Sequence, residues 1–188
     1  MALLTEENLV YEMLLVTRTN VTPVGVVRKG DSLNFKLFPG KSFGELQRDR
    51  HVAIQATNDP ELLVRTALNL PVELKFEEKE PYRWIKGLPG WLGKATCAEE
   101  TWRDDIGETR VLKCSLKPEG EIPGRLPQRP FTRADCLLVE MAVLFTRYLI
   151  CPKDSLRNGI LRLYTTYRHL GGSSESADYI VQHLNQSE

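Results

Sequence analysis

The sequence predicts an α+β fold, mainly β, with a strand-rich first half and a helical C-terminal third. Three observations carry this prediction. Residues 8–38 contain apolar stretches separated by turn residues, residues 94–118 have the pattern of a hairpin, and residues 131–186 place apolar side chains at helical spacing. The 188 residues suffice for one domain of ordinary size. We therefore expect a single domain over 1–188, with the strand-rich core in residues 1–118.

The first three strands are predicted over residues 8–18, 21–29 and 32–38, and short turns connect them. The third stretch alternates apolar and polar side chains, which is the pattern of a half-buried strand. Consecutive strands joined by tight turns form an antiparallel meander. Pro23 within the second stretch indicates an edge position or a bulge, and Gly25 indicates a bulge or a close backbone approach.

Two short helices and a strand follow. We expect a helix over residues 43–50, a strand over 51–57 and a second helix over 60–69. Asp59 is a natural N-cap for the second helix, and Pro60 suits its first turn. Both helices are expected to belong to the strand-rich core.

A hairpin is predicted from residues 94–104 and 108–118, whereas residues 70–93, with three prolines, predict no clear element. The hairpin brings Cys97 close to Cys114 across its strands. In a cytosolic chain the expected state is a reduced packing pair. A redox-active pair is the alternative.

A linker rich in proline and glycine precedes the helical part of the chain. Its first helix is predicted over residues 132–150, with Thr132 and Asp135 as a capping box and Phe131 stapled to Cys136. This helix is apolar on most sides, so we expect it in a core or a subunit interface. Two further helices are predicted over residues 154–170 and 175–186.

Composition excludes several classes of function. Lys plus Arg and Asp plus Glu are 25 each, so the chain lacks the positive surplus that nonspecific nucleic-acid binding requires. The longest apolar stretch, residues 136–150, is interrupted by charges, which argues against a membrane span. The four cysteines form no CxxC and the three histidines are scattered, so no metal site is expected. The N-terminus does not resemble a signal peptide, and a cytoplasmic protein fits best.

The stretch Pro39-Gly40-Lys41-Ser42 is the first candidate for a binding site. It connects a strand directly to a helix, and the N–H groups at a helix start bind anions. Lys41 and Ser42 could therefore hold a phosphate. The alternative is a surface turn whose serine caps the helix. The stretch is not a Walker A loop, because Phe35 stands where that motif requires its first glycine.

A second candidate is the polar run from Gln55 to Asp59, which follows the fourth strand and could hydrogen-bond the edge of a flat ring. Alternatively, this run only turns the chain and caps the next helix. A charged stripe on the helix 132–150 is either a solvated face, an intersubunit salt bridge or a substrate contact; it consists of Arg133, Glu140 and Arg147.

Three tryptophans are candidates for either core positions or a stacking platform: Trp84, Trp91 and Trp102. The sequence offers no evident nucleophile–base pair or carboxylate dyad, so the catalytic residues are unknown. If the protein is an enzyme, we expect a cofactor to supply the chemistry.

Several short motifs occur in a characteristic order. They are Tyr11-Glu12, Asn20 to Val26, Leu37 to Ser42, Val52 to Pro60, Phe131 to Ala134, and Glu140 to Arg147. Their order and spacing resemble an uncharacterised protein family (domain of unknown function 447). That family is placed in the FMN-binding split-barrel superfamily with the flavin reductases.

The resemblance implies a six-stranded antiparallel split β-barrel, usually a homodimer, that binds FMN at the dimer interface. It further implies that the turn and short helix after the third strand hold the phosphate, that the second strand lines the flavin ring and that the end of the fourth strand supports it. The cofactor-binding residues carried over in this way are Thr22, Val24, Lys41, Ser42, Phe43, Gln55, Thr57 and Asn58.

The chain departs from the family pattern at four positions. Ser42 stands where relatives often carry Thr, and Gln55 and Thr132 stand where Asn is usual. Glu45 replaces an Asn that often lies three residues after the phosphate-turn hydroxyl. Its carboxylate would repel a phosphate if it faced the site.

The leading hypothesis is an FMN-binding protein that acts as an oxidoreductase of the flavin-reductase type on an unknown substrate. The alternative is a non-enzymatic split-barrel module for binding or assembly that does not use flavin, which Glu45 and the missing catalytic residue favour. A third hypothesis is a flavin-free enzyme that binds a phosphate ligand through Lys41.

Overall fold

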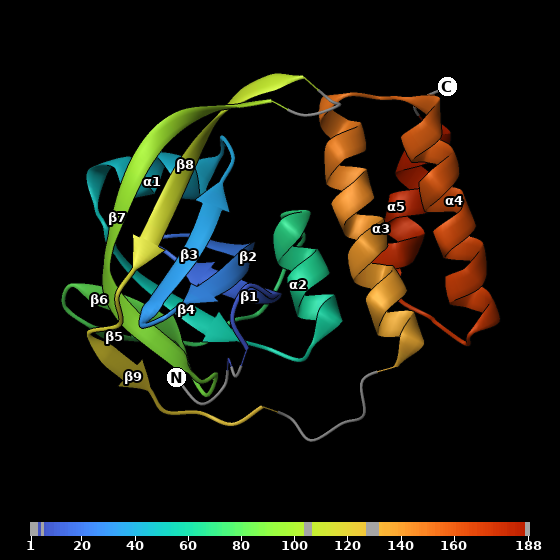
Figure 1. The fold of residues 1–188 in the computed structure, drawn as a ribbon. Coiled ribbons are helices and arrows are strands. Elements are labelled where there is room, and N and C mark those ends of the chain that lie inside the picture. Colours follow the sequence, from blue (N-terminus) through green and yellow to red (C-terminus); the bar gives the residue numbers. More distant parts are fainter. Residues whose placement is uncertain (1–3, 5, 104–106, 127–131, 187–188) are drawn as a thin grey trace. The chain divides into compact units, whose positions relative to one another are not determined.

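The computed structural model describes residues 4, 6–103, 107–126 and 132–186. The chain forms two compact units (Figure 1). The strand-rich unit comprises residues 1–57 and 73–127, and the helical unit comprises residues 58–72 and 128–188. The single domain predicted from the sequence has a strand-rich core and a helical C-terminal part, and the two units differ from these parts chiefly because residues 58–72 belong to the helical unit.

Six antiparallel strands of the strand-rich unit form a closed ring. Their pairing order is β1–β2–β3–β8–β7–β4, and β4 pairs in turn with β1. The strands are β1 (Val10–Val16), β2 (Val21–Lys29), β3 (Ser32–Leu37), β4 (His51–Ala56), β7 (Gly90–Arg103) and β8 (Glu108–Leu116). The predicted meander and hairpin are therefore confirmed.

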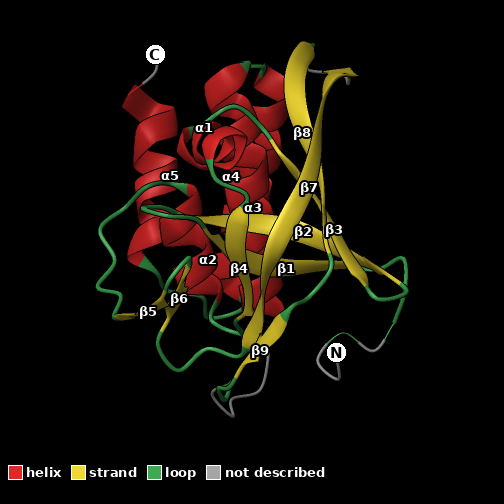
Figure 2. Cartoon of the chain, turned by 90° about the vertical axis from the view of Figure 1, so that its left-hand side faces the viewer, coloured by secondary structure: helices red, strands yellow, loops and turns green. Residues whose placement is uncertain are grey.

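The long strand β7 closes the ring because its two halves have different partners (Figure 2). Residues 90–94 pair with β4, and residues 95–103 pair with β8. Gly90 permits this closure, since a Cβ at that position would overlap the carbonyl oxygen of Ile54.

The stretch that predicted no clear element contains a separate two-stranded sheet and the start of β7. The small sheet consists of β5 (Phe76–Lys79) and β6 (Tyr82–Ile85). A further short strand, β9 (Gly120–Ile122), pairs with the first residues of β7, within the stretch predicted as a linker.

The core of the strand-rich unit consists of inward-facing side chains of the ring strands together with Phe43 and Leu46 of α1 (Lys41–Arg48). Trp91 belongs to this core and is 2% exposed. Of the three tryptophans, this one therefore has the core role that the sequence allowed.

The structure joins Cys97 and Cys114 by a disulfide, so the expected reduced pair is wrong. The two residues are direct partners in the β7–β8 register, with Cα atoms 4.1 Å apart. Opposed positions of an antiparallel pair bring side chains close enough for such a bond.

The helical unit consists of four helices: α2 (Pro60–Ala67), α3 (Arg133–Ile150), α4 (Asp154–His169) and α5 (Glu175–Gln186). The three helices predicted in the C-terminal part and the helix predicted over residues 60–69 are all present. However, α2 belongs to this unit and not to the strand-rich core, because its buried Val64 packs into the same cluster as Met141 and Phe145 of α3.

The predicted helix starts are confirmed at two positions. Asp59 accepts hydrogen bonds from the N–H groups of Glu61 and Leu62, and Thr132 forms a capping box with Asp135. The predicted staple partner Phe131 lies outside the described residues.

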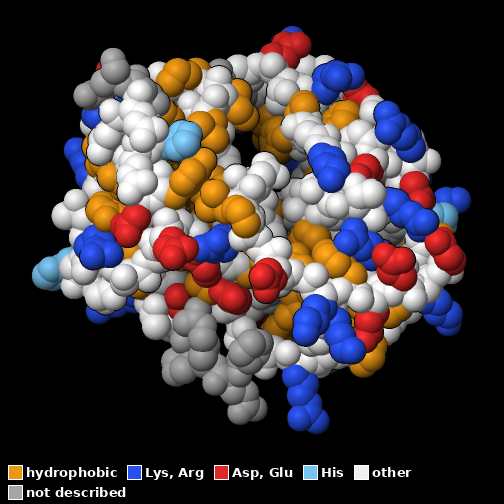
Figure 3. All heavy atoms as spheres, turned by 180° about the vertical axis from the view of Figure 1, so that it is seen from behind, with side chains coloured by type: hydrophobic (Ala, Val, Ile, Leu, Met, Phe, Trp, Pro, Cys, Tyr) orange, Lys and Arg blue, Asp and Glu red, His pale blue; other side chains and the backbone are white. Residues whose placement is uncertain are grey.

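The surface carries charges of both signs. Figure 3 shows Lys and Arg side chains interspersed with Asp and Glu side chains over one face. Among the described helices, none has the length and apolar character needed to cross a membrane.

Candidate functional site

The N-terminus of α1 is the centre of the candidate site. Its N-cap is Gly40, which has no side chain to accept a hydrogen bond from the first turn, and this turn contains no acidic residue. The first N–H groups of a helix have no intrahelical acceptor. Within the described residues, α1 thus begins with N–H donors that no side chain caps and with the cation of Lys41, which suits an anion.

Three polar side chains meet beside this helix start. The Asn20 amide nitrogen lies 3.0 Å from Thr22 Oγ1 and 2.9 Å from Ser42 Oγ, and the two hydroxyl oxygens are 2.9 Å apart. We call Asn20, Thr22 and Ser42 the polar triangle. It connects the β1–β2 turn and β2 to the first turn of α1.

A count of hydrogens shows what the polar triangle can still donate. The amide carries two N–H hydrogens and each hydroxyl carries one. The three contacts use one hydrogen each. One hydroxyl hydrogen of Thr22 or Ser42 is therefore left over, and an oxygen of an anion could accept it.

Glu45 lies in the second turn of α1 and points to the β1–β2 turn. Its carboxylate accepts hydrogen bonds from Thr17 Oγ1 at 2.6 Å, from the Thr19 N–H at 3.1 Å and from the Thr19 hydroxyl. Burial alone would raise the pKa of Glu45, but these hydrogen bonds and the charge of Lys41 lower it. The carboxylate is thus ionised at neutral pH and bound by the protein's own donors.

Gln55 is fully buried, and its side-chain amide binds backbone groups. The amide nitrogen donates to the carbonyl oxygens of Ile85 and Leu88, at 2.9 and 2.7 Å, and the amide oxygen accepts from the Ile85 N–H at 2.6 Å. Both N–H hydrogens are used. This side chain fastens β4 to the end of β6 and the following loop.

The other predicted site residues lie in different environments. Val24 and Phe43 are buried in the apolar core, at 5% and 4% exposure, whereas Lys41 is exposed. Thr57 and Asn58 are half-buried and follow β4, where the strand-rich unit ends and the helical unit begins. The structure therefore brings Thr22, Lys41 and Ser42 together at α1, while the side chains of Val24 and Phe43 face the core.

Asn20 was not predicted as a site residue, although it belongs to one of the quoted motifs. An asparagine in a turn is ordinarily explained by the turn itself. Its amide contacts Ser42, 22 residues further along the chain. Only the packing of α1 against the β1–β2 turn reveals this contact.

The remaining sequence candidates do not join this site. Arg133, Glu140 and Arg147 are exposed on α3. Trp84 donates its indole N–H to Glu77, and Lys36 lies 3.6 Å from the ring centre of Trp102. In the described residues, no group of three or more His, Cys, Asp or Glu side chains could hold a metal ion.

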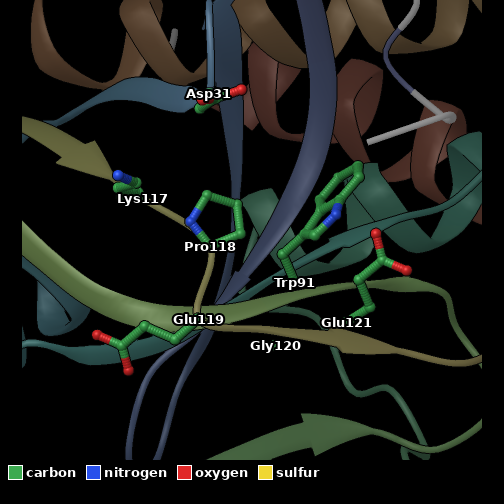
Figure 4. A pocket seen from close by; sticks show the side chains of 7 residues that line it. All are labelled: Asp31, Trp91, Lys117, Pro118, Glu119, Gly120 and Glu121. Carbon is green, nitrogen blue, oxygen red and sulfur yellow. The ribbon is translucent and has the colours of Figure 1, made fainter.

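A separate cavity of about 340 Å³ lies near β9 and the start of β7 (Figure 4). Its charged lining is mostly acidic, with Asp31, Glu119 and Glu121 against Lys117. Glu119 also accepts a hydrogen bond from Tyr82, and burial together with this carboxylate raises the pKa of Tyr82 to about 12. A phosphate is disfavoured in such surroundings.

Comparison with known proteins identifies the family. The model of the N-terminal domain of the proteins of unknown function DUF447 matches residues 11–123, and a second model of the same family matches residues 132–184. The chain belongs to the DUF447 family. The search of curated proteins gave no match.

Solved structures give the fold relationship. The FMN-bound protein MM1853 from Methanosarcina mazei, also of the DUF447 family, is 19% identical with a TM-score of 0.70, over 97% of this chain and 96% of that one.

Two flavin reductases are more distant. A flavin reductase domain protein from Arthrobacter sp. FB24 has a TM-score of 0.45 at 10% identity, over 63% of this chain and 80% of its own. The flavin reductase of styrene monooxygenase from Pseudomonas putida S12 has a TM-score of 0.41 at 10% identity, over 63% of this chain and 84% of its own.

Proposed function

We propose that the strand-rich unit binds FMN and that the protein is a flavin-dependent oxidoreductase of the flavin-reductase type. The observation that carries the proposal is the donor set at the start of α1, where an uncapped helix N-terminus, Lys41 and the polar triangle lie together. A family member of the same fold was crystallised with FMN, which supports the choice of ligand.

In this proposal, the residues at α1 hold the flavin phosphate. The N–H groups of the first turn and the Lys41 ammonium provide charge-assisted hydrogen bonds, and the spare hydroxyl hydrogen of the polar triangle adds another donor. The donor set fits a phosphate monoester, which has acceptor oxygens and a negative charge.

The flavin ring is then expected along β2 near Thr22 and Val24, with support from Thr57 and Asn58. Because the Val24 side chain faces the core, we assign its contribution to the backbone. We assign Gln55 the role of holding β4, β6 and the loop after it in place. Bound FMN would supply electron transfer, and the protein would position it.

The resemblance also supports two structural parts of the proposal. The six-stranded ring is a split β-barrel, and the protein is a homodimer. We further propose that it works in the cytoplasm. The flavin-free module is no longer favoured by Glu45, because that carboxylate is bound by Thr17 and Thr19.

A titration of purified protein with FMN tests the proposal. We expect saturable binding, which is measured as the quenching of flavin fluorescence. Lys41→Ala should weaken FMN binding by about 1.5–3 kcal/mol, the scale of a charge-assisted hydrogen bond. Riboflavin, which lacks the phosphate, should be bound equally by both proteins.

Lys29→Ala is the matched control, since Lys29 is an exposed lysine at the other end of β2. It should leave the FMN affinity unchanged. A wild-type protein that does not bind FMN would refute the proposed function. If the wild type binds FMN and Lys41→Ala binds it equally well, the phosphate lies elsewhere.

A further inference from the structure

We propose that Glu45 is a positioning residue for the phosphate site, whose carboxylate fixes the β1–β2 turn on α1 and thereby keeps Asn20 on Ser42. The inference rests on the proposed function and deepens it. It assigns Glu45 the opposite effect from the one that its charge suggests in the sequence.

The β1–β2 turn has its own internal closure. The Thr17 N–H donates to the Asn20 carbonyl oxygen at 3.0 Å. The Thr17 hydroxyl oxygen lies 3.2 Å from the same carbonyl oxygen, but its one hydrogen goes to the closer Glu45 carboxylate. The turn is therefore closed by a backbone hydrogen bond of its own, and this bond does not determine where the turn lies relative to α1.

Two groups of α1 connect the helix to this turn. Ser42, in the first turn of the helix, contacts the Asn20 amide, and Glu45, one turn later, accepts from Thr17 and Thr19. Residues three apart on a helix lie on neighbouring parts of its surface. The Glu45 contacts thus hold the turn at the place where Asn20 reaches Ser42.

The position of Asn20 determines how the hydroxyl donor of the polar triangle is oriented toward a phosphate. The Asn20 amide donates to both hydroxyl oxygens and so orients Thr22 and Ser42, and the one hydroxyl hydrogen left over is then held in a direction fixed by three contacts. If the turn shifts and Asn20 moves away, the Thr22 and Ser42 hydroxyls contact only each other. The remaining hydroxyl hydrogen is then no longer held in one direction. Loss of Glu45 should therefore weaken the binding of a phosphate monoester.

The charge of Glu45 does not oppose this role. Three hydrogen bonds from Thr17 and Thr19 occupy its oxygens. The charged group that acts on it is Lys41, four residues earlier on α1, and this cation also lowers the pKa of the Glu45 carboxyl. A carboxylate that is bound and partly neutralised in this way repels a nearby phosphate less strongly.

The test compares FMN with riboflavin. Dissociation constants of both flavins are measured by fluorescence titration for the wild type, Glu45→Ala and Glu45→Gln. We expect Glu45→Ala to weaken FMN binding about ten-fold, which corresponds to one charge-assisted hydrogen bond, and to change riboflavin binding less than about two-fold. Glu45→Gln should restore part of the FMN affinity, since its amide oxygen still accepts from a threonine hydroxyl.

Glu99→Ala is the matched control. Glu99 also binds α1, through Gln47, but in the helix's C-terminal half. Its loss should leave both affinities unchanged. If Glu45→Ala does not fold, Thr19→Ala removes the hydroxyl donor of the same contact while the Thr19 N–H and the Thr17 hydroxyl keep theirs, and it should give a smaller loss that is again selective for FMN.

Each outcome decides the inference. A selective loss of FMN with partial rescue by Gln supports it. Unchanged or tighter FMN binding in a folded Glu45→Ala protein overturns it, and so does an equal loss for FMN and riboflavin, which would indicate general damage to the unit. A wild type that binds no FMN overturns the proposed function itself, which is a different result from wild-type binding without an effect of Glu45.

Discussion

The helix starts of the two units differ in their side-chain caps: three of the four described helices of the helical unit have one, and α4 is the exception. In the helical unit, Asp59 caps α2, Thr132 and Asp135 cap α3, and Ser174 accepts from two N–H groups at the start of α5. In the strand-rich unit, α1 begins at Gly40 without a side-chain cap.

The difference lies in whether a side chain of the protein accepts hydrogen bonds from the N–H groups at the helix start. A capped N-terminus has its donors satisfied within the chain, which adds to stability. At α1, by contrast, the nearby polar groups bind each other and the turn, and no side chain caps the helix N–H groups, which the proposed function assigns to the phosphate. The comparison predicts that capping α1 harms binding, whereas uncapping a helix of the other unit harms only stability.

The largest effect is expected from Gly40→Asp, which gives α1 the cap that it lacks. Gly40 has extended backbone, φ 168° and ψ −170°, and an added Cβ would lie 3.9 Å from the Phe38 carbonyl oxygen, so a side chain fits there. Its carboxylate would occupy the N–H donors and repel the phosphate, so FMN should bind about ten-fold more weakly or worse.

The same titration gives the controls for this variant. Gly40→Asn introduces a similar shape without charge and should lose less FMN affinity. Riboflavin binding and the free energy of unfolding without ligand should not fall in either variant. Unaltered FMN binding by Gly40→Asp would break the comparison, because α1 would then have no part in holding the ligand.

A smaller effect is expected from Asp59→Ala, which removes the cap of α2. The variant should lower the free energy of unfolding by about 1 kcal/mol, the usual cost of a lost N-cap. Urea denaturation measures this change. Asp154→Ala is the comparison, since Asp154 lies exposed in the first turn of α4 without being its N-cap, and it should cost only about 0.3 kcal/mol. Equal losses in the two variants would contradict a specific role of the Asp59 cap.

The smallest effect is a pH dependence that comes from Glu61 of α2. Burial alone would raise its pKa, but hydrogen bonds from Ser174 and Ser176 and the Arg65 guanidinium lower it below 4.5. Since the folded state lowers this pKa, the stabilisation is present above pH 4.5 and is lost as the pH falls through the folded-state value.

Unfolding measurements at about pH 7 and about pH 3 test this sign, because the Glu61 carboxyl of the unfolded chain, with its ordinary pKa of 4.5, becomes protonated between them. The wild type should lose more stability on acidification than Glu61→Gln does. If both proteins lose the same amount, the Glu61 network contributes nothing that depends on its charge.

Much of the fold was predictable because it depends on local patterns. The alternation in residues 32–38, the Asp59-Pro60 helix start and the Thr132/Asp135 capping box each involve residues a few positions apart. The phosphate-binding candidates Lys41 and Ser42 were also found locally, from a turn that leads directly into a helix. What escaped prediction in residues 70–93 are short strands without a periodic pattern.

The candidate site itself required contacts between distant parts of the chain. The sequence suggested that Glu45 repels a phosphate, but its carboxylate binds Thr17, 28 residues earlier. Likewise, Gln55 binds the backbone of Ile85, 30 residues away, and so connects β4 to the end of β6, with both of its amide hydrogens used. The direction of a polar side chain depends on which donors packing brings near it.

By itself, therefore, the sequence determined the order and type of the elements, since hydrophobic period, caps and turns act within a few residues. Tertiary structure alone decided the closure of the six-stranded ring, the assignment of α2 to the helical unit, the Cys97–Cys114 bond and the direction of Glu45. These features depend on which surfaces pack together, and a contact between residues far apart in sequence leaves no local pattern to read.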